Sequence, residues 1–364
     1  MTSVEKNPIL RLALRETFYK QFCAGENKVS TRKTAQQLNN IGYHGVVLEY
    51  ALEVLRDVKG ADEAKDVAVW RRGLLDSIDM ARPGDFVAFK WSGLGGAAFH
   101  RMEAGEDPSP LMDAAMREVC DAATAKTVYL LPSAEETSTL PTFHKWTLQM
   151  SDIYNRGPAG AIIYNTYQAY LRQTPATISQ HLQEAQKAGY TLGIKLVRGA
   201  YMGTEPRQLI WGSAEETHNA YDSVTSAILR RKYDGLLPPP AVSKIFPPVH
   251  VVLATHNAAS TRKAQAIRKQ QLQDNEPLVP LMYAQLQGMA DEISCELLAE
   301  ARVSQSPAAP MVYKYSPWGT MTQCLGYLLR RAGENKDAAG RTLESRIAMG
   351  QELRRRFRAL FGIA

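Results

Sequence analysis

Cysteine is scarce in this chain of 364 residues, and its four copies stand far apart at Cys23, Cys120, Cys295 and Cys324. None belongs to a C-x-x-C pair, and none has a histidine at metal-ligand spacing. The sequence therefore indicates neither a disulfide framework nor a zinc site, and we expect no bound metal. Such cysteine usage is typical of a reducing compartment.

Long apolar runs are also missing, because no stretch approaches the length of about 18 residues that a membrane-spanning helix needs. The start of the chain mixes Lys6, Arg11 and Arg15 with Glu5 and Glu16. It lacks both the apolar core of a secretory signal and the acid-poor character of a mitochondrial presequence. The sequence carries no readable address, and we expect a cytoplasmic protein if the N-terminus is complete as given.

Charge of one sign is not concentrated in any long block. The net charge of +6 is compatible with an anionic ligand, a membrane surface or nucleic acid, and does not choose among them. The basic residues lack the aromatic interleaving of a nucleic-acid groove, so we expect no nucleic-acid partner. A hydrophobic content of 45% supports a sizeable core, and the length suits two average domains or one α/β barrel.

Short apolar runs alternate with helical patterns along the chain, which is typical of an α/β protein. We predict eight strands, over Tyr43–Leu48, Phe86–Trp91, Val128–Leu131, Ala161–Tyr164, Leu192–Val197, His250–Ala254, Val279–Tyr283 and Met311–Tyr315. Predicted helices include Thr31–Ile41, Asp113–Ala125, Thr177–Ala188, Ala214–Arg231, Ser260–Gln271 and Asp291–Glu300. Eight strands, each followed by a helix, predict a (βα)8 barrel, with a doubly wound open sheet as the alternative.

No linker divides the chain, because the proline-rich stretch over residues 232–248 is typical of a loop before the sixth strand. We predict one domain over residues 1–364, with an N-terminal helical extension over 1–42 and a C-terminal helix within 343–364. The pattern over Leu343–Phe361 gathers apolar residues near one face, against several arginines. A packed terminal helix and a helix lying on a membrane surface are both open.

The stretch over Tyr313–Asn335 combines a strand, a turn at Pro317 and Gly319, and a helix. Arg330 and Glu334 share a face of that helix, and Arg331 lies about 100° further round. Two guanidinium groups near a strand end could converge on one small anion, since arginine suits bidentate carboxylate recognition. Spacing alone leaves open a solvated helix face with an ordinary ion pair.

Polar or small residues follow the predicted strands, where ligands bind in such a barrel. Lys90 lies within an otherwise apolar strand, and because burying it unpaired would be costly we expect it to point inward. The others are Glu49, Glu53, Ser133, Ala134, Glu135, Gln168, Tyr170, Lys195, Arg198, Gly199, Ala200, Tyr201, Thr255, His256, Asn257, Gln285, Gln287, Gly288 and Tyr315. Any one of these could cap a helix. Together they indicate a polar ligand lying across the mouth.

Gly93, Gly95 and Ala98 fit the G-x-G-x-x-A pattern of a dinucleotide-binding turn. No long apolar helix follows them, and no second strand ends in an acidic residue at the expected distance. We therefore do not predict a dinucleotide-binding fold.

Several motifs in order resemble those of the flavin-dependent proline dehydrogenases. They are KLVRGAY over Lys195–Tyr201, ATHN over Ala254–Asn257, QLQGMAD over Gln285–Asp291, and KYSPWG followed by YLLRRAGEN in the last strand and helix. FYKQFCAGEN over Phe18–Asn27 and GVVLEYALE over Gly45–Glu53 are similar to the fungal branch. The resemblance runs from about residue 8 to the C-terminus. It implies a (βα)8 barrel that binds FAD at its mouth, oxidises L-proline by hydride transfer to flavin N5, and passes electrons to a quinone in mitochondria.

The resemblance also assigns residues by motif. Arg330 and Arg331 would hold the substrate carboxylate beside Lys90, Tyr315 and Tyr327 would shape the pocket, and Glu53 would pair with the first arginine and gate the site. Gln168 and Lys195 match positions near the isoalloxazine ring, and Lys90, Lys195 and Ser133 are the catalytic candidates. The remaining FAD-binding candidates are Ala134, Arg198, Gly199, Ala200, Thr255, His256, Asn257, Gln285 and Glu334.

Two residues depart from the family pattern. Ser133 stands where the family has an aspartate thought to pair with the strand-two lysine, so we expect Lys90 to lose its partner. Trp318 stands where a smaller aromatic residue is usual. Besides a proline dehydrogenase, the sequence therefore leaves open a related flavoenzyme acting on another cyclic amino acid and a non-catalytic amino-acid-binding homologue.

Overall fold

The computed structural model describes residues 7–51, 62–240, 245–304, 306–334 and 343–360. For residues 330–334, and for part of the last helix, it describes the backbone alone. Among these residues, no helix is both long and apolar enough to cross a membrane. The same residues contain no group of three or more His, Cys, Asp or Glu side chains placed to hold a metal ion.

Eight parallel strands form one sheet in the order β3-β2-β1-β8-β7-β6-β5-β4. Their bounds are β1 Gly45–Tyr50, β2 Phe86–Phe89, β3 Tyr129–Pro132, β4 Tyr164–Gln168, β5 Leu192–Val197, β6 Val249–Ala254, β7 Leu281–Leu286 and β8 Met311–Trp318. A parallel bridge between Leu130 and Ile163 joins β3 to β4. The sheet is therefore a nearly closed barrel, as predicted, and the open-sheet alternative is wrong.

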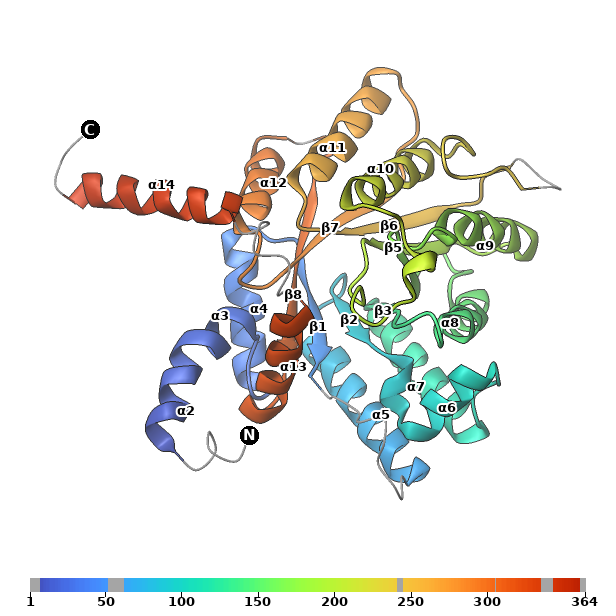
Figure 1. Cartoon of the computed structure of the whole chain (residues 1–364), viewed down its shortest axis with the longest axis horizontal. Coiled ribbons are helices and arrows are strands. Elements are labelled where there is room, and N and C mark those ends of the chain that lie inside the picture. The colour runs from blue at the N-terminus through green and yellow to red at the C-terminus, as the bar shows by residue number, and fades with distance from the viewer. Residues whose placement is uncertain (1–6, 52–61, 241–244, 305, 335–342, 361–364) are drawn as a thin grey trace.

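Helices surround the barrel and extend from both ends of the chain (Figure 1). They are α2 Pro8–Leu14, α3 Lys20–Phe22, α4 Lys28–Ile41, α5 Glu63–Met80, α6 Gly96–Ala104, α7 Pro110–Lys126, α8 Leu140–Tyr154, α9 Thr174–Ala188, α10 Ala214–Arg230, α11 Ala258–Gln273, α12 Asp291–Val303, α13 Met321–Glu334 and α14 Leu343–Leu360. The six predicted helices are all present, as α4, α7, α9, α10, α11 and α12. The predicted N-terminal helical extension is present as α2, α3 and α4.

The inside of the barrel is filled at its N-terminal end and polar at its C-terminal end. The ring of Phe86 lies 5.1 Å from that of Tyr313 and 5.5 Å from that of Tyr164, centroid to centroid, which closes the lower end. Val47 and Val252 belong to the same apolar cluster. Since side chains alternate across a strand, residues one pleat further along face the mouth.

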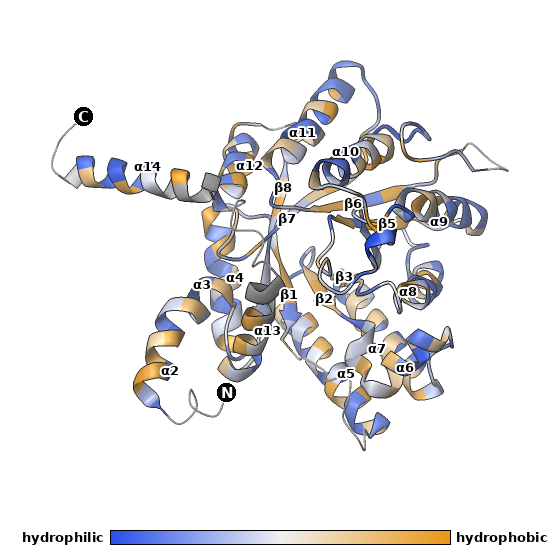
Figure 2. Cartoon of the chain, viewed as in Figure 1, coloured by the Kyte–Doolittle hydropathy of each residue, from blue (hydrophilic) through white to orange (hydrophobic). Residues whose placement is uncertain are grey.

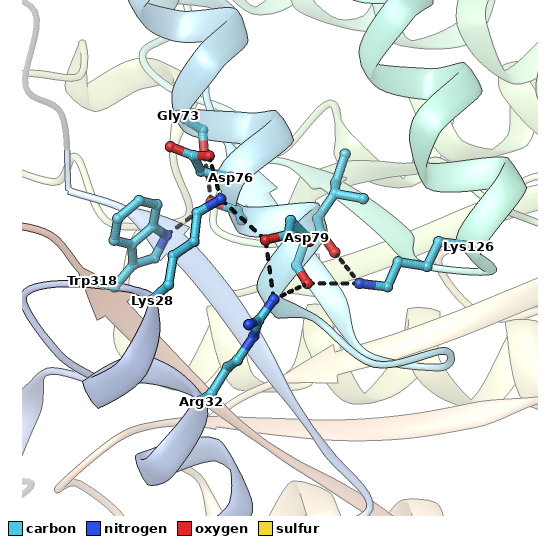
Figure 3. Close-up of polar contacts among 9 residues, drawn as sticks. Lys28, Arg32, Gly73, Asp76, Asp79, Lys126 and Trp318 are labelled. Carbon is cyan, nitrogen blue, oxygen red and sulfur yellow. Dashed lines mark hydrogen bonds and ion pairs between the residues drawn. The ribbon is translucent and has the colours of Figure 1, made fainter.

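The N-terminal extension is tied to the barrel's outer layer by charges on α4 and α5, shown in Figure 3. Lys28 lies 2.8 Å from Asp76 and 3.1 Å from Asp79, and Arg32 reaches Asp79 at 3.0 Å. In the same region, Nε1 of Trp318 donates to Oγ of Ser77 at 2.8 Å. These contacts fix helix α5 against both the extension and the end of β8.

Helix α14 leads away from the barrel (Figure 1), and Figure 2 shows hydrophilic and hydrophobic residues mixed along it. Ile347, Leu353 and Phe357 are exposed by 51%, 66% and 62%. The exposure of these three residues does not support a terminal helix packed along this apolar face.

Candidate active site

Inward-pointing polar side chains gather where the strands end. Lys90 follows β2 and Ser133 follows β3, while Gln168 is the last residue of β4. Lys195 and Tyr315 lie in the second half of β5 and β8. Gln168 and Lys195 are more than nine-tenths buried. These five residues therefore lie close together at one end of the barrel, through contacts with one another and with the loop after β3.

Lys90 is held by a carboxylate from the loop after β3. Its Nζ lies 2.8 Å from Oε1 of Glu135, and the Tyr201 hydroxyl is 3.3 Å from the same nitrogen. The expectation that Ser133 leaves Lys90 without a partner is wrong. The reason is that Glu135, two residues further along, turns back over the mouth and supplies the negative charge.

Ser133 contacts the second lysine instead. Nζ of Lys195 donates to Oγ of Ser133 at 3.1 Å and lies 5.6 Å from the ring centroid of Tyr315. A hydroxyl in this place accepts a hydrogen bond from Lys195 but brings no negative charge of its own. Among the contacts at the mouth, Lys90 is thus bonded to a carboxylate and Lys195 to a hydroxyl.

A hydrogen bond from the last residue of β4 holds the loop after β3. Nε2 of Gln168 donates to the backbone oxygen of Glu135 at 2.8 Å, and Ala134 is buried beside it. The Gln168 amide is thus committed in part to the loop that holds Lys90.

Arg198, just after β5, is the centre of a hydrogen-bond network with helices α10 and α11. Its guanidinium donates to Nδ1 of His218 at 2.9 Å, to Oγ1 of Thr255 at 2.7 Å and to Oγ of Ser260 at 2.8 Å. It also lies 4.3 Å from the ring centroid of Tyr221. The guanidinium plane is therefore held rigidly at the ends of β5 and β6.

Gly199 follows with a φ of 134°, a backbone conformation that favours glycine. A β-carbon there would collide with the ring of Tyr170. Ala200 comes next, so the chain after β5 presents only small side chains beside Arg198. Burial, followed by the charge of Glu205, raises the pKa of the Tyr170 hydroxyl.

Three further predicted residues take part in local structure. Nε2 of His256 accepts from the backbone nitrogen of Leu286 at 3.1 Å. The side-chain oxygen of Asn257 caps α11 by accepting from the backbone nitrogen of Ser260 at 2.9 Å. Oε1 of Gln285 accepts from Oγ of Ser294 at 3.0 Å, while its buried Nε2 has no partner among the described residues.

The remaining predicted residues belong to α13 or lie outside the described part. Tyr327 is buried in a cluster with Tyr19 and Cys324, which packs α13 against the N-terminal helices. The backbones of Arg330, Arg331 and Glu334 lie in the last turns of α13, but their side chains are outside the described part, as is Glu53 altogether.

Sequence reasoning missed the part played by Glu135 and His218. Glu135 was recognised only as a residue after the third strand, and its spacing from Lys90 gives no signal for a pair that depends on the loop's path. His218 lies within helix α10, so no predicted strand end is near it in the sequence. Trp318, in contrast, packs its ring 4.7 Å from that of Tyr50, outside the barrel, and does not face the mouth.

Comparison with known proteins identifies the family of the chain. The family model described as "Proline dehydrogenase" matches residues 31–344. The chain belongs to this family. Curated relatives include the hydroxyproline dehydrogenase of Bos taurus, 28% identical over 94% of this chain and 81% of that protein. The probable mitochondrial proline dehydrogenase of Schizosaccharomyces pombe is 33% identical over 66% of this chain and 49% of that protein.

Solved structures show the same fold. Proline utilization A from Bdellovibrio bacteriovorus, in a form inactivated by N-propargylglycine, superimposes with a TM-score of 0.68 at 17% identity. The match covers 90% of this chain and 33% of that one. The chain thus spans a third of that structure and about half the length of several curated family members, including a mitochondrial one from Caenorhabditis elegans at 54%.

Proposed function

We propose that the protein is an FAD-dependent dehydrogenase that oxidises L-proline to 1-pyrroline-5-carboxylate in proline catabolism. The observation that carries this proposal is the meeting of Lys90 and Lys195 with Tyr315 at the barrel mouth of a proline dehydrogenase family member. Two cations and an aromatic ring suit a small, carboxylated, cyclic substrate beside an electron acceptor.

The residues present fit a flavin. The chain after β5 has no bulky side chain at Gly199 and Ala200, where the backbone runs against Tyr170, and Arg198 stands beside it in a fixed orientation. We propose that FAD is held by Ala134, Gln168, Lys195, Arg198, Gly199, Ala200, Thr255, His256, Asn257, Gln285 and Glu334. When bound, this group supplies the acceptor for a hydride from the substrate carbon next to the ring nitrogen.

The chain's own residues bind and orient the substrate. Lys90, fixed by Glu135, offers its ammonium group to the substrate carboxylate, and we assign Arg330 and Arg331 to the same carboxylate. We assign Tyr315 and Tyr327 to the walls of the substrate pocket and Glu53 to the gating of the site. Lys195, supported by Ser133, keeps positive charge where negative charge grows during reduction.

The location, the electron acceptor and the membrane contact of the protein are also proposals. Relatives in fission yeast and Caenorhabditis elegans are named mitochondrial, which supports a mitochondrial location and gives none to the cytoplasmic alternative. We propose a quinone as electron acceptor and peripheral membrane contact, for which the exposed Leu353 and Phe357 beside the arginines of α14 give support. The division into a single domain over residues 1–364 stays a prediction.

A second substrate is favoured by one observation. Relatives from Bos taurus and Mus musculus are named hydroxyproline dehydrogenases, the mouse protein being 34% identical over 66% of this chain. The departure at Ser133 concerns the same mouth. The second candidate is therefore a flavoenzyme acting on a hydroxylated or otherwise modified cyclic amino acid.

An anaerobic flavin titration distinguishes the proposed function from the second candidate. The visible spectrum of the purified protein is recorded, and L-proline or 4-hydroxyproline is then added. Rapid bleaching by L-proline supports the proposed function, whereas bleaching by hydroxyproline alone favours the second candidate. A protein that binds flavin and proline without any bleaching would be a non-catalytic homologue, and one that cannot take up FAD would refute both enzymatic proposals.

A further inference from the structure

Glu49 is a buried acid at the mouth that none of the assignments above uses. It lies two residues after Val47, on the face of β1 that points into the barrel, and is 6% exposed. Its Oε2 has no hydrogen-bond partner in the part of the chain that the structure describes. Burying a carboxylate oxygen without a hydrogen-bond donor costs folding free energy. A functional role for Glu49 would explain this cost.

The neighbouring strands explain why no donor reaches it. In register with Glu49 stand Ala88 on β2 and Pro317 on β8. Neither side chain can donate a hydrogen bond. Lys90, one pleat above Ala88 on the same face, is bonded to Glu135. The carboxylate oxygen is thus left for a donor that arrives from the mouth.

We propose that Oε2 of Glu49 accepts a hydrogen bond from the secondary ammonium group of the substrate. This inference rests on the proposed function. A cyclic amino acid carries a carboxylate and an ammonium on adjacent atoms, and the cations assigned above recognise the carboxylate alone. Glu49 completes the recognition of the zwitterion and fixes which side of the ring faces the acceptor. It therefore makes the site selective for charged cyclic amines over uncharged rings of the same shape.

The rival role for Glu49 is to orient the arginines that bind the carboxylate. The two roles differ in the ligands that they affect. An ammonium site matters only for ligands with an ammonium group, whereas an arginine-orienting residue matters for every carboxylate that enters.

The experiment compares L-proline with cyclopentanecarboxylate, which has the same shape and carboxylate but no amine. Binding to the dithionite-reduced holoenzyme is measured anaerobically by calorimetry, so that no turnover occurs. In Glu49→Gln we expect L-proline to bind about tenfold more weakly or worse, since a hydrogen bond to a charged group is lost. We expect cyclopentanecarboxylate to bind as tightly as before or more tightly.

A matched control removes one buried carboxylate at the opposite end of the barrel. Asp85 is 2% exposed and accepts from the backbone nitrogens of Val46 and Arg82 at 3.0 and 2.8 Å. Asp85→Asn should lower stability and leave the affinity ratio of the two ligands unchanged. If Glu49→Gln fails to fold, Glu49→Asp replaces it, and a selective loss of proline affinity of a few-fold is then expected.

An equal loss of affinity for both ligands, or no change for either, would overturn the ammonium site. The proposed function fails separately. If proline does not bleach the oxidised flavin but Glu49→Gln still weakens proline binding selectively, the ammonium site stands and the oxidation does not. If the unmodified holoenzyme binds neither ligand, both proposals are refuted.

Discussion

Nζ of Lys90 lies 2.8 Å from Oε1 of Glu135, so the cation at the end of β2 is held by a residue from the loop after β3. The side chains of the pair are 21% and 9% exposed, which protects their attraction from solvent more than at the surface. The same loop is bound to β4 through Gln168. The position of the Lys90 ammonium group therefore depends on β2, on the loop after β3 and on β4.

Glu135→Gln tests this control. The neutral amide has the shape of the glutamate side chain but no charge. Without the ion pair, the Lys90 side chain should no longer be held in one position at the mouth. We expect kcat/KM for L-proline to fall roughly tenfold, mainly through KM. Glu118→Gln is the control, because its pair with Arg71 at 2.8 Å is exposed on the outer surface. Steady-state kinetics that are the same for both variants would contradict this role.

Ser133→Asp addresses the departure from the family pattern. Because Lys195 donates to Ser133, an aspartate there should pair with Lys195 and cancel positive charge beside the proposed flavin. We expect the midpoint potential of the bound flavin to become more negative by roughly 30 mV, about 1.4 kcal/mol for a two-electron couple. Ser133→Asn, which has no charge, should leave the potential close to the original value. Spectroelectrochemistry measures both, and an equal shift in the two variants would show that charge is not the cause.

The strand pattern predicted the barrel because its apolar runs are short, regular and separated by helical periodicity. The fourth strand was placed at Ala161–Tyr164, three residues early, because Asn165, Thr166 and Gln168 are polar. They are buried nonetheless, since Asn165 bonds to His144 and Thr166 bonds to the backbone of Pro132. Polar strand residues satisfied by distant partners cannot be recognised from local composition.

In the candidate site, too, some residues could be predicted from the sequence and others could not. Residues at strand ends, such as Lys90 and Lys195, follow from the rule that barrel ligands bind there. Their partners, Glu135 and Ser133, depend on how one loop folds back, and motif comparison assigned the lysine partner wrongly. Contacts set by a loop's path are fixed by tertiary structure and leave no spacing signal.

Trp318→Phe should affect stability and leave substrate choice unchanged. The indole donates to Ser77 and packs on Tyr50 outside the barrel, away from the mouth. We expect the free energy of unfolding to fall by about 1–3 kcal/mol, with the ratio of proline to hydroxyproline turnover unchanged. Ser77→Ala should be destabilising through the same bond, so the double variant should lose less than the sum. Denaturant unfolding measures the change in stability, and substrate kinetics measure the ratio of proline to hydroxyproline turnover. A change in that ratio would contradict the placement of Trp318 outside the barrel.

Two buried histidines predict an acid-sensitive fold. Nδ1 of His181 lies 2.9 Å from the Tyr167 hydroxyl, Nδ1 of His144 lies 3.0 Å from Oδ1 of Asn165, and the two rings are 5.0 Å apart. Burial lowers the pKa of His144 to about 4; burial and then the neighbouring His144 lower that of His181 to about 3. Since unfolded histidine has a pKa near 6.5, the unfolded chain binds more protons between these values. Stability is therefore full above about pH 6.5 and is lost as the pH falls toward 4.

By the time each folded pKa is reached, the loss should be about 3 kcal/mol for His144 and about 4 kcal/mol for His181. His181→Gln removes one of the two titrating groups while keeping a side chain that can bond to Tyr167. Its free energy of unfolding should be lower than that of the unmodified protein at pH 7 and should fall less steeply between pH 6.5 and 4.5. His100→Gln is the control, because His100 is exposed on α6 and should leave the slope as it was. Urea unfolding at several pH values measures the slopes, and a slope in His181→Gln equal to that of the unmodified protein would show that the acid sensitivity arises elsewhere.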